Sequence, residues 1–128
     1  MLDKLSIDTI AAIFEALPME VSFVDSDDTV RYYSKGDKRI FRRTPSVIGM
    51  KVQKCHPQKS VDKVGQILAD FRAGARDTAE FWIDLKGRTI LIRYFAVRDV
   101  AGAYLGCLEA TQDITDLKKI EGEKRLLD

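Results

Sequence analysis

Three strand-like segments joined by tight turns fill the last third of the chain. Apolar and polar residues alternate over Thr78–Leu85, a pattern that places every second side chain on one face of a β-strand. The next segment, Thr89–Arg98, is apolar on both faces, and Tyr104–Thr111 follows after a glycine-containing turn. A strand that is apolar on both faces needs cover on both. The sequence therefore predicts an antiparallel meander, covered on one side by helices and on the other by the N-terminal helix or a partner subunit.

Amphipathic patterns predict helices on either side of these strands. Apolar residues recur at helical spacing over residues 7–17, and Pro18 ends that helix because the residue before a proline resists the α region. Ser60–Ala73 has one apolar and one polar face, as expected of a helix that covers a sheet. A weaker stripe after Asp116 predicts a further helix. We therefore divide the chain into an N-terminal flanking helix, a central domain and a C-terminal linker or signalling helix (residues 1–17, 18–115 and 116–128).

The segment between the first two helices begins with a predicted hairpin. Glu20–Val24 and Thr29–Tyr33 are rich in β-branched and aromatic residues and are joined by a short polar turn. Residues 34–59 show no clean period and are punctuated by glycine and proline, so short helical turns and loops are expected there. The chain as a whole is predicted to be an α+β domain.

Length and composition exclude several classes of protein. The chain has 128 residues, 45% of them hydrophobic, and a formal net charge of +1, which favours one folded domain over a disordered chain. No apolar run approaches the ~18 residues of a membrane span, and Cys55 and Cys107 are too few for a disulfide framework. We therefore expect a cytoplasmic protein with no membrane partner.

Basic residues concentrate in one third of the chain. Residues 31–63 hold ten of the 21 basic residues and only two acidic ones. Such a segment can face an anion, an acidic partner or nucleic acid, or it can be a solvated surface. Because the overall pI is only about 7.7 and no nucleic-acid-binding motif accompanies the cluster, nucleic acid is not the expected partner.

Asp99, Gly102 and Gly106 form a turn of the type Asp-x-x-Gly-x-x-x-Gly, and the last strand ends in Asp-Ile-Thr at residues 113–115. This closing motif and the order of elements resemble those of a PAS domain. The resemblance implies a five-stranded antiparallel sheet of order 2-1-5-4-3, with helices on one face and flanking N- and C-terminal helices. It also implies that Asp113 and Thr115 fasten the exiting segment to the core.

Several further segments point to a narrower resemblance: Phe23-Val24-Asp25, residues 30–36, Arg43-Thr44-Pro45, Ile48-Gly49, Cys55-His56-Pro57 and residues 79–83. They resemble one PAS subgroup, which often forms the C-terminal module of bacterial and archaeal proteins with a hemerythrin-like domain upstream. This resemblance implies a sensory or regulatory homodimer that works with an attached signalling or hemerythrin-like domain. A small ligand or a partner would bind between the Ser60–Ala73 helix and the sheet, and the terminal helices would relay its presence.

Five residues are candidates for ligand binding: Arg31, Tyr33, Cys55, His56 and Arg93. His56 is the only histidine, and haem-binding PAS domains usually take their iron ligand from a histidine near this helix. Imidazole and thiolate both bind iron, so His56, or Cys55 in its place, is the candidate haem ligand. The alternative is structural, with Cys-His-Pro shaping the loop before the helix.

Arg93 interrupts a strand that is otherwise apolar. It is a candidate to hold a small organic acid in the central pocket, as are Arg31, Arg42 and Arg43. Equally, Arg93 can pair with Glu80 or Glu109 on neighbouring strands. Trp82, which alternates with Phe81 and Ile83, is expected to pack against the N-terminal helix, or alternatively against a partner chain.

No pattern in the chain favours catalysis. Cys55 and His56 are adjacent in sequence, so their side chains usually point apart, and no third group can be named to orient them. No phosphate-binding glycine loop is present, and Cys55, His56 and Cys107 are too few for a structural zinc ion. The expectation is a non-enzymatic module, either ligand-binding or a ligand-free module for dimerisation and docking.

Overall fold

In the computed structural model, residues 1–55 and 58–127 are described, as are side chains other than those of residues 58–60. The chain folds as an α+β domain with five strands and two α-helices. Three 3-10 turns, Gly36–Lys38, Pro45–Val47 and Val52–Cys55, lie in the irregular segment between the hairpin and the second helix. The elements are α1 (Ile7–Ala16), β1 (Glu20–Asp25), β2 (Val30–Tyr33), α2 (Gln58–Ala73), β3 (Thr78–Leu85), β4 (Arg88–Arg98) and β5 (Tyr104–Asp113).

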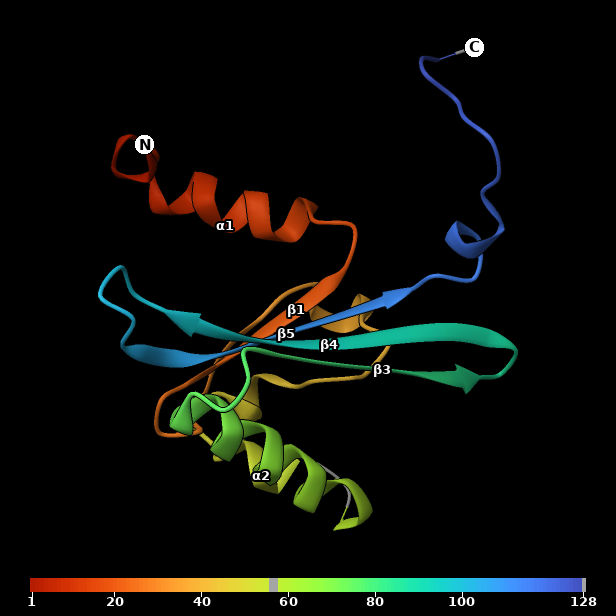
Figure 1. Cartoon of the computed structure of the whole chain (residues 1–128). Helices are drawn as coiled ribbons and strands as arrows, with labels where there is room; N and C mark the ends of the chain where they lie inside the picture. The colour runs from red at the N-terminus through yellow and green to blue at the C-terminus, as the bar shows by residue number, and fades with distance from the viewer. Residues whose placement is uncertain (56–57, 128) are drawn as a thin grey trace.

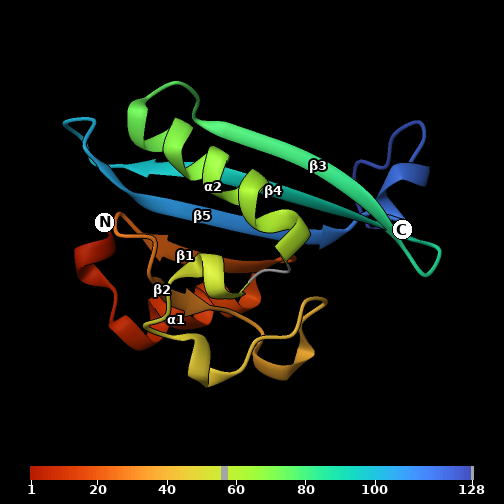
Figure 2. The same ribbon diagram turned by 90° about the horizontal axis from the view of Figure 1, so that it is seen from below.

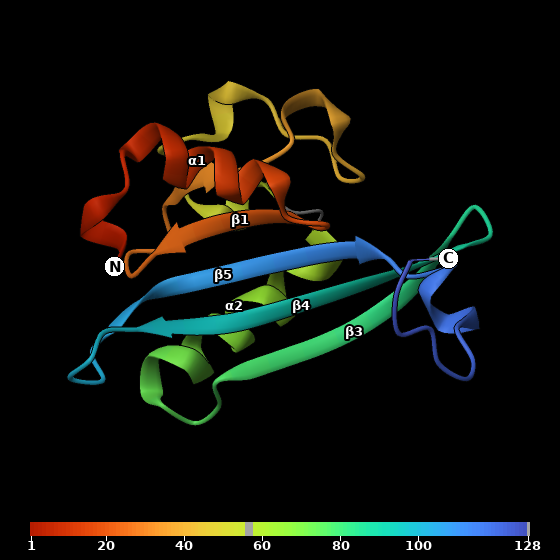
Figure 3. The same cartoon turned by 90° about the horizontal axis from the view of Figure 1, so that it is seen from above.

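The five strands form one antiparallel sheet of order β2-β1-β5-β4-β3, which confirms the predicted order. β1 pairs with both its hairpin partner β2 and the last strand β5, so the two ends of the domain meet in the middle of the sheet (Figures 1 and 3). Glu20 at the start of β1 pairs with Thr111 near the end of β5. The N-terminal connection and the C-terminal exit therefore lie side by side.

The hydrophobic core lies between α2 and one face of the sheet, which we call the inner face (Figure 2). Leu68 and Phe71 on α2 pack with Ile90, Ile92 and Tyr94 on β4, and Phe71 is fully buried. Burial of each such side chain stabilises the fold by about 1.5–3 kcal/mol. α2 and the central strands are therefore the rigid frame of the domain.

The opposite, outer face of the sheet is covered at Val21 on β1 but open on β3. α1 lies on this side, above β1 and β2, and contains no buried residue (Figure 1). Trp82 on β3 is 65% exposed. The expectation that the N-terminal helix packs on Trp82 is therefore wrong, because α1 is held near β2, at the other edge of the sheet.

The C-terminal segment also differs from the expectation. After β5 the chain makes one 3-10 turn, Leu117–Lys119, and the remaining described residues form no helix (Figure 1). Ile120 is 71% exposed, so the apolar stripe has no surface to bury itself against. Short isolated helices are marginal in water without such burial. No described helix is long and apolar enough to cross a membrane.

Candidate functional site

A buried ion pair joins β1 to the irregular segment beneath the inner face. The Arg39 guanidinium lies 3.2 Å from the Glu20 carboxylate, and their side chains are 1% and 4% exposed. Glu20 also accepts hydrogen bonds from the backbone N–H groups of Ile40 (2.6 Å) and Phe41 (3.2 Å). Burial lowers the pKa of Arg39, and the neighbouring Glu20 opposes that shift. The pair thus fixes the path of a segment that has no regular structure of its own.

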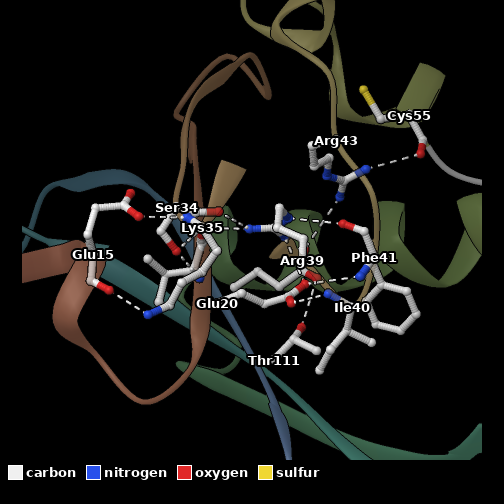
Figure 4. Close-up of polar contacts among 12 residues, drawn as sticks. Glu15, Glu20, Ser34, Lys35, Arg39, Ile40, Phe41, Arg43, Cys55 and Thr111 are labelled. Carbon is white, nitrogen blue, oxygen red and sulfur yellow. Dashed lines mark hydrogen bonds and ion pairs between the residues drawn. The ribbon is translucent and has the colours of Figure 1, made fainter. Parts of the chain in front are cut away.

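The remaining donors of Arg39 bind backbone oxygens. Nη1 donates to the carbonyls of Val21 (3.2 Å) and Ser34 (3.1 Å), and Nε donates to Phe41 O (3.0 Å). The Ser34 hydroxyl in turn accepts from the Val21 N–H at 2.8 Å. Arg39 therefore links both strands of the hairpin to the irregular segment (Figure 4).

The same network reaches α1 through Lys35 and Glu15. The Lys35 N–H donates to the Glu15 carboxylate at 3.0 Å, and the Tyr32 hydroxyl donates to its other oxygen at 3.1 Å. The Lys35 ammonium donates to the backbone oxygens of Glu15 and Leu17 (Figure 4). These contacts tie the C-terminal end of α1 to the end of β2. We call this group, which runs from Glu15 to Glu109, the polar network: Glu15, Glu20, Ser34, Lys35, Arg39, Arg43, Glu109 and Thr111.

At the far end of the polar network, Arg43 and Glu109 form a loose pair. Their nearest nitrogen and oxygen are 4.0 Å apart, beyond hydrogen-bond distance, although the side chains are only 12% and 11% exposed. Thr111 donates to Glu109 at 3.3 Å, and Arg43 donates to Cys55 O at 3.4 Å. Burial, and then Glu109, raises the pKa of Tyr94. Arg43 and Glu109 are therefore two enclosed charges that make no hydrogen bond to each other, and this pair is the candidate functional site.

The structure brings two of the predicted ligand-binding residues near this site. Tyr33 is half-buried, and the Arg39 guanidinium lies 5.8 Å from its ring centroid. Cys55 is half-buried and contacts Arg43 through its backbone oxygen. Arg31 lies elsewhere, because its side chain is 57% exposed and pairs with Asp25 at 2.7 Å. His56 lies outside the described residues, so its ligation of haem stays a prediction.

Arg93 lies on the outer face of the sheet, not in the central pocket. In the register of β4, Arg93 pairs with Ala110, whereas its neighbour Tyr94 pairs with Glu109 on the inner face. The expectations that Arg93 holds an acid in that pocket or pairs with Glu109 are therefore wrong. Glu80 is its direct partner on β3, yet no described residue forms an ion pair with Arg93.

Core side chains of the described part of α2 pack against the sheet. A groove of about 510 Å³ lies on the outer face near Trp82, and one of about 290 Å³ lies beside the α1–β1 connection and Lys38. Neither groove is lined by α2. Leu68 and Phe71 of α2 belong to the packed core, so a ligand pocket beneath this helix stays a prediction.

A comparison with known protein families identifies the family of this domain. A family model described as PAS domain matches residues 10–115. The chain belongs to the PAS domain family. The C-terminal domain of a protein from Streptococcus mutans is 37% identical to this PAS domain, covers 91% of each chain and superposes with a TM-score of 0.84.

More distant solved structures share the fold at low identity. The PAS domain of BvgS from Bordetella pertussis is 16% identical, with 88% of this chain and 96% of that chain covered and a TM-score of 0.64. The sensor region of a sensor histidine kinase is 21% identical, with 78% and 41% covered and a TM-score of 0.55. No curated protein matches this PAS domain.

The motif that carried the PAS resemblance closes the sheet. Asp99 accepts a hydrogen bond from Ala103 N at 2.9 Å, within the turn where Gly102 has a positive φ of 89°. At the exit of β5, Thr115 donates to Asp113 at 2.6 Å, and its hydroxyl accepts from Thr89 N at 2.8 Å. Asp113 and Thr115 therefore join the exit segment to the start of β4.

The sequence interpretation missed most of the polar network. Glu20, Ser34 and Arg39 were not candidates, and Glu109 was considered only as a partner of Arg93. One signal was available, because Glu20 and Glu109 are acidic residues within strands that are otherwise largely apolar. Arg39 does not stand out in the sequence in the same way, because it lies among other basic residues in a segment without a regular hydrophobic pattern.

Proposed function

We propose that this PAS domain is a sensory or regulatory module that binds a small ligand or a partner at the Arg43–Glu109 end of the polar network. The observation that carries the proposal is the 4.0 Å separation of these two enclosed charges. Binding at this site would be relayed to the terminal segments of the chain. The protein would act as a cytoplasmic homodimer in which each chain is attached to a signalling or hemerythrin-like domain. A solved structure of the same fold is the sensor region of a sensor histidine kinase, which supports a signalling role.

The chemistry at Arg43 favours a small organic acid as the ligand. A guanidinium binds a carboxylate through two parallel hydrogen bonds, and such charge-assisted pairs are stronger than neutral ones. Arg43 does not have this geometry with Glu109, so a ligand carboxylate would gain contacts that the free protein lacks. Of the four arginines named from the sequence for this role, Arg31 and Arg42 are exposed and Arg93 lies on the outer face.

The polar network supplies a route from this site to the N-terminal helix. Arg43 lies four residues after Arg39, whose pair with Glu20 holds the start of β1. Ser34 and Lys35 continue the contacts to Glu15 on α1. A ligand that shifts the irregular segment at Arg43 would therefore move Arg39 through the backbone between them, and the contacts of Ser34 and Lys35 would carry the shift to α1.

Thermal unfolding with a panel of small mono- and dicarboxylic acids tests the proposal. A binding acid at about 100 times its Kd stabilises a protein by about 2.7 kcal/mol, or roughly 10 °C in Tm for a chain of this size. We expect this rise in the wild type and in Arg42→Met, a matched exposed arginine, and its loss in Arg43→Met. A rise that persists in Arg43→Met would remove Arg43 from the site.

A ligand-free PAS module for dimerisation or docking is the second candidate. The packed core between α2 and the sheet favours it, because Phe71 is fully buried there. Failure of every acid to raise the Tm would favour this candidate.

A haem-based redox or gas sensor that uses His56 is the third candidate, carried from the sequence alone. An absorption spectrum after addition of hemin tests it directly. A sharp Soret band that disappears in His56→Ala would establish it, and a broad, unspecific spectrum would reject it.

A further inference from the structure

Arg43 leaves most of its hydrogen-bonding capacity unused. A guanidinium carries five N–H donors. Among the described residues, Arg43 donates one hydrogen bond, to Cys55 O at 3.4 Å (Figure 4). Its side chain is only 12% exposed, yet none of its nitrogens is both fully buried and without a partner. The unused donors of Arg43 therefore reach a small accessible space.

Two further polar groups beside Arg43 are also unused. The Glu109 Oε2 atom lies 4.0 Å from Arg43 and accepts no hydrogen bond from a described residue, because Thr111 donates to the other oxygen. Tyr94 is 7% exposed, and its hydroxyl has no hydrogen-bond partner in the described part of the chain. Tyr94 and Glu109 are paired in the register of β4 and β5, and Tyr94 interacts electrostatically with both Glu109 and Arg43. A cation, an anion and a hydroxyl thus lie together with free hydrogen-bonding capacity.

The charges around this site balance. Arg39 interacts electrostatically with Arg43 and Glu109, but its own charge is neutralised by a carboxylate at 3.2 Å. Arg43 and Glu109 then contribute one positive and one negative charge. A ligand with a carboxylate alone would bind Arg43 but place a second carboxylate beside Glu109, and like charges repel most strongly where water is excluded. A ligand that carries both a carboxylate and an ammonium would satisfy both residues.

The short distance between the two charges limits the size of such a ligand. Charge-assisted hydrogen bonds from a nitrogen to an oxygen are about 2.7–2.9 Å long. Arg43 and Glu109 are only 4.0 Å apart, so the two charged groups of the ligand must lie next to each other. In an α-amino acid, both groups are attached to the same carbon atom. Because both side chains are about nine-tenths enclosed, the amino acid must itself have a small side chain.

We propose that the Arg43–Glu109 site binds a small α-amino acid as its zwitterion. The Arg43 guanidinium donates to the carboxylate of the amino acid, and the Glu109 carboxylate accepts from its ammonium group. The Tyr94 hydroxyl, whose pKa is raised by burial and then by Glu109, stays protonated and donates to the ligand carboxylate. The inference names the class of small organic acid in the proposed function and rests on that function.

NMR titration of the isotope-labelled full chain with three matched compounds tests the inference. Alanine carries both charged groups, propionate lacks the ammonium, and ethylamine lacks the carboxylate. We expect alanine to bind the wild type at least about tenfold more tightly than propionate, because a hydrogen bond to a charged group is typically worth at least this factor. Ethylamine should not bind. The backbone signals of Arg43 and Glu109 should shift and saturate with alanine.

Two substitutions test the roles of the two charges. Glu109→Gln keeps the shape of the side chain and removes its charge, so alanine should bind at least about tenfold more weakly, while propionate should bind no more weakly than to the wild type. Arg43→Met should abolish binding of both compounds. Glu80→Gln, which neutralises an exposed acid on β3, is the matched control and should leave both Kd values unchanged.

The outcomes separate this inference from the proposed function. Equal Kd values for alanine and propionate in the wild type, with both lost in Arg43→Met, would retain the proposed function and overturn the amino-acid specificity. A preference for alanine that persists in Glu109→Gln would also overturn it, because the ammonium would then be recognised elsewhere.

A titration without shifts for alanine, glycine and serine would overturn the amino-acid ligand, whereas the proposed function is judged separately by the Tm shifts with simple acids. If a variant folds poorly, the comparison of alanine with propionate and ethylamine on the wild type still decides the inference. A ratio near one between the Kd values of alanine and propionate rejects it.

Discussion

Gly106 on β5 lies so close to Val24 on β1 that a methyl group on Gly106 would overlap the Val24 backbone oxygen and the Phe23 ring. Gly106 also has a φ of 150°, in the range that favours glycine. We therefore expect Gly106→Ala to lower the free energy of unfolding by about 3 kcal/mol, from backbone strain and overpacking together. Urea denaturation measures the change.

Gly102→Ala is the matched control for this substitution. Gly102 also has a positive φ, but a methyl group there would meet no atom within 4 Å. We expect a loss of about 1 kcal/mol from backbone strain alone. Equal losses in the two variants would show that the contact with Val24 does not constrain β5.

The Asp113 carboxylate should make the stability of the domain fall at acid pH. Hydrogen bonds from Arg88 and then Thr115 lower its pKa from the usual 3.8 to about 2. A carboxyl with a lowered pKa in the folded state contributes stability above its usual pKa and loses it as the pH falls through the folded value. The advantage of the wild type over Asp113→Asn should thus be full above about pH 4 and vanish towards about pH 2.

Urea midpoints of both proteins from neutral pH to about pH 2 test this dependence. The asparagine keeps an oxygen for Thr115, so the comparison isolates the carboxylate charge. In an Arg88→Gln background, which removes the main donor to Asp113, the pH-dependent difference should shrink. A difference between wild type and Asp113→Asn that stays constant over this pH range would contradict the assignment.

Alternation of apolar and polar residues predicted β3 well, and a continuous apolar run bounded by turns predicted β4. β3 runs over Thr78–Leu85, as expected, and β4 begins at Arg88, one residue earlier than expected. The sheet order came from the PAS resemblance, since periodicity does not say which strands are neighbours. The predicted C-terminal helix does not form in residues 116–127, because a short apolar stripe does not form a stable helix without a surface to cover.

The site was harder to predict for two physical reasons. β4 is apolar on both faces, so alternation alone could not show whether Tyr94 or Arg93 points towards α2. Glu20 and Arg39 are brought together only by the tertiary structure. Arg39 lies in a segment without a regular hydrophobic period, so the sequence does not predict which way its side chain points. Arg43 was identified only by its charge, and its contact with Glu109 required the fold.

The buried pair of Glu20 and Arg39 should be a main determinant of stability. Removal of one partner leaves a desolvated charge, which typically costs about 3–5 kcal/mol. We expect Arg39→Met to lower the free energy of unfolding by this amount in urea denaturation. Arg42→Met, at an exposed position nearby, should change it by less than about 0.5 kcal/mol. Similar values for both variants would mean that the pair adds no stability beyond a surface arginine.

The contact between Glu15 and Lys35 should control the order of α1 independently of the core. Because α1 buries no residue, its few side-chain contacts with β2 hold it in place. We expect Glu15→Ala to speed amide hydrogen exchange across α1 while exchange in β4 and β5 stays unchanged, as in a locally unfolding unit.

Mass spectrometry of exchange in peptides from α1 and from the core strands measures this difference. Glu121→Ala, which removes an exposed acid from the C-terminal segment, is the control and should leave α1 exchange as in the wild type. If an acid binds at Arg43 and slows exchange in α1, Glu15→Ala should abolish that slowing without abolishing binding. Unchanged α1 exchange in Glu15→Ala would instead mean that other contacts restrain α1. The tilted ring contact between Phe14 and Tyr32, with centroids 5.9 Å apart, is the next of these to test.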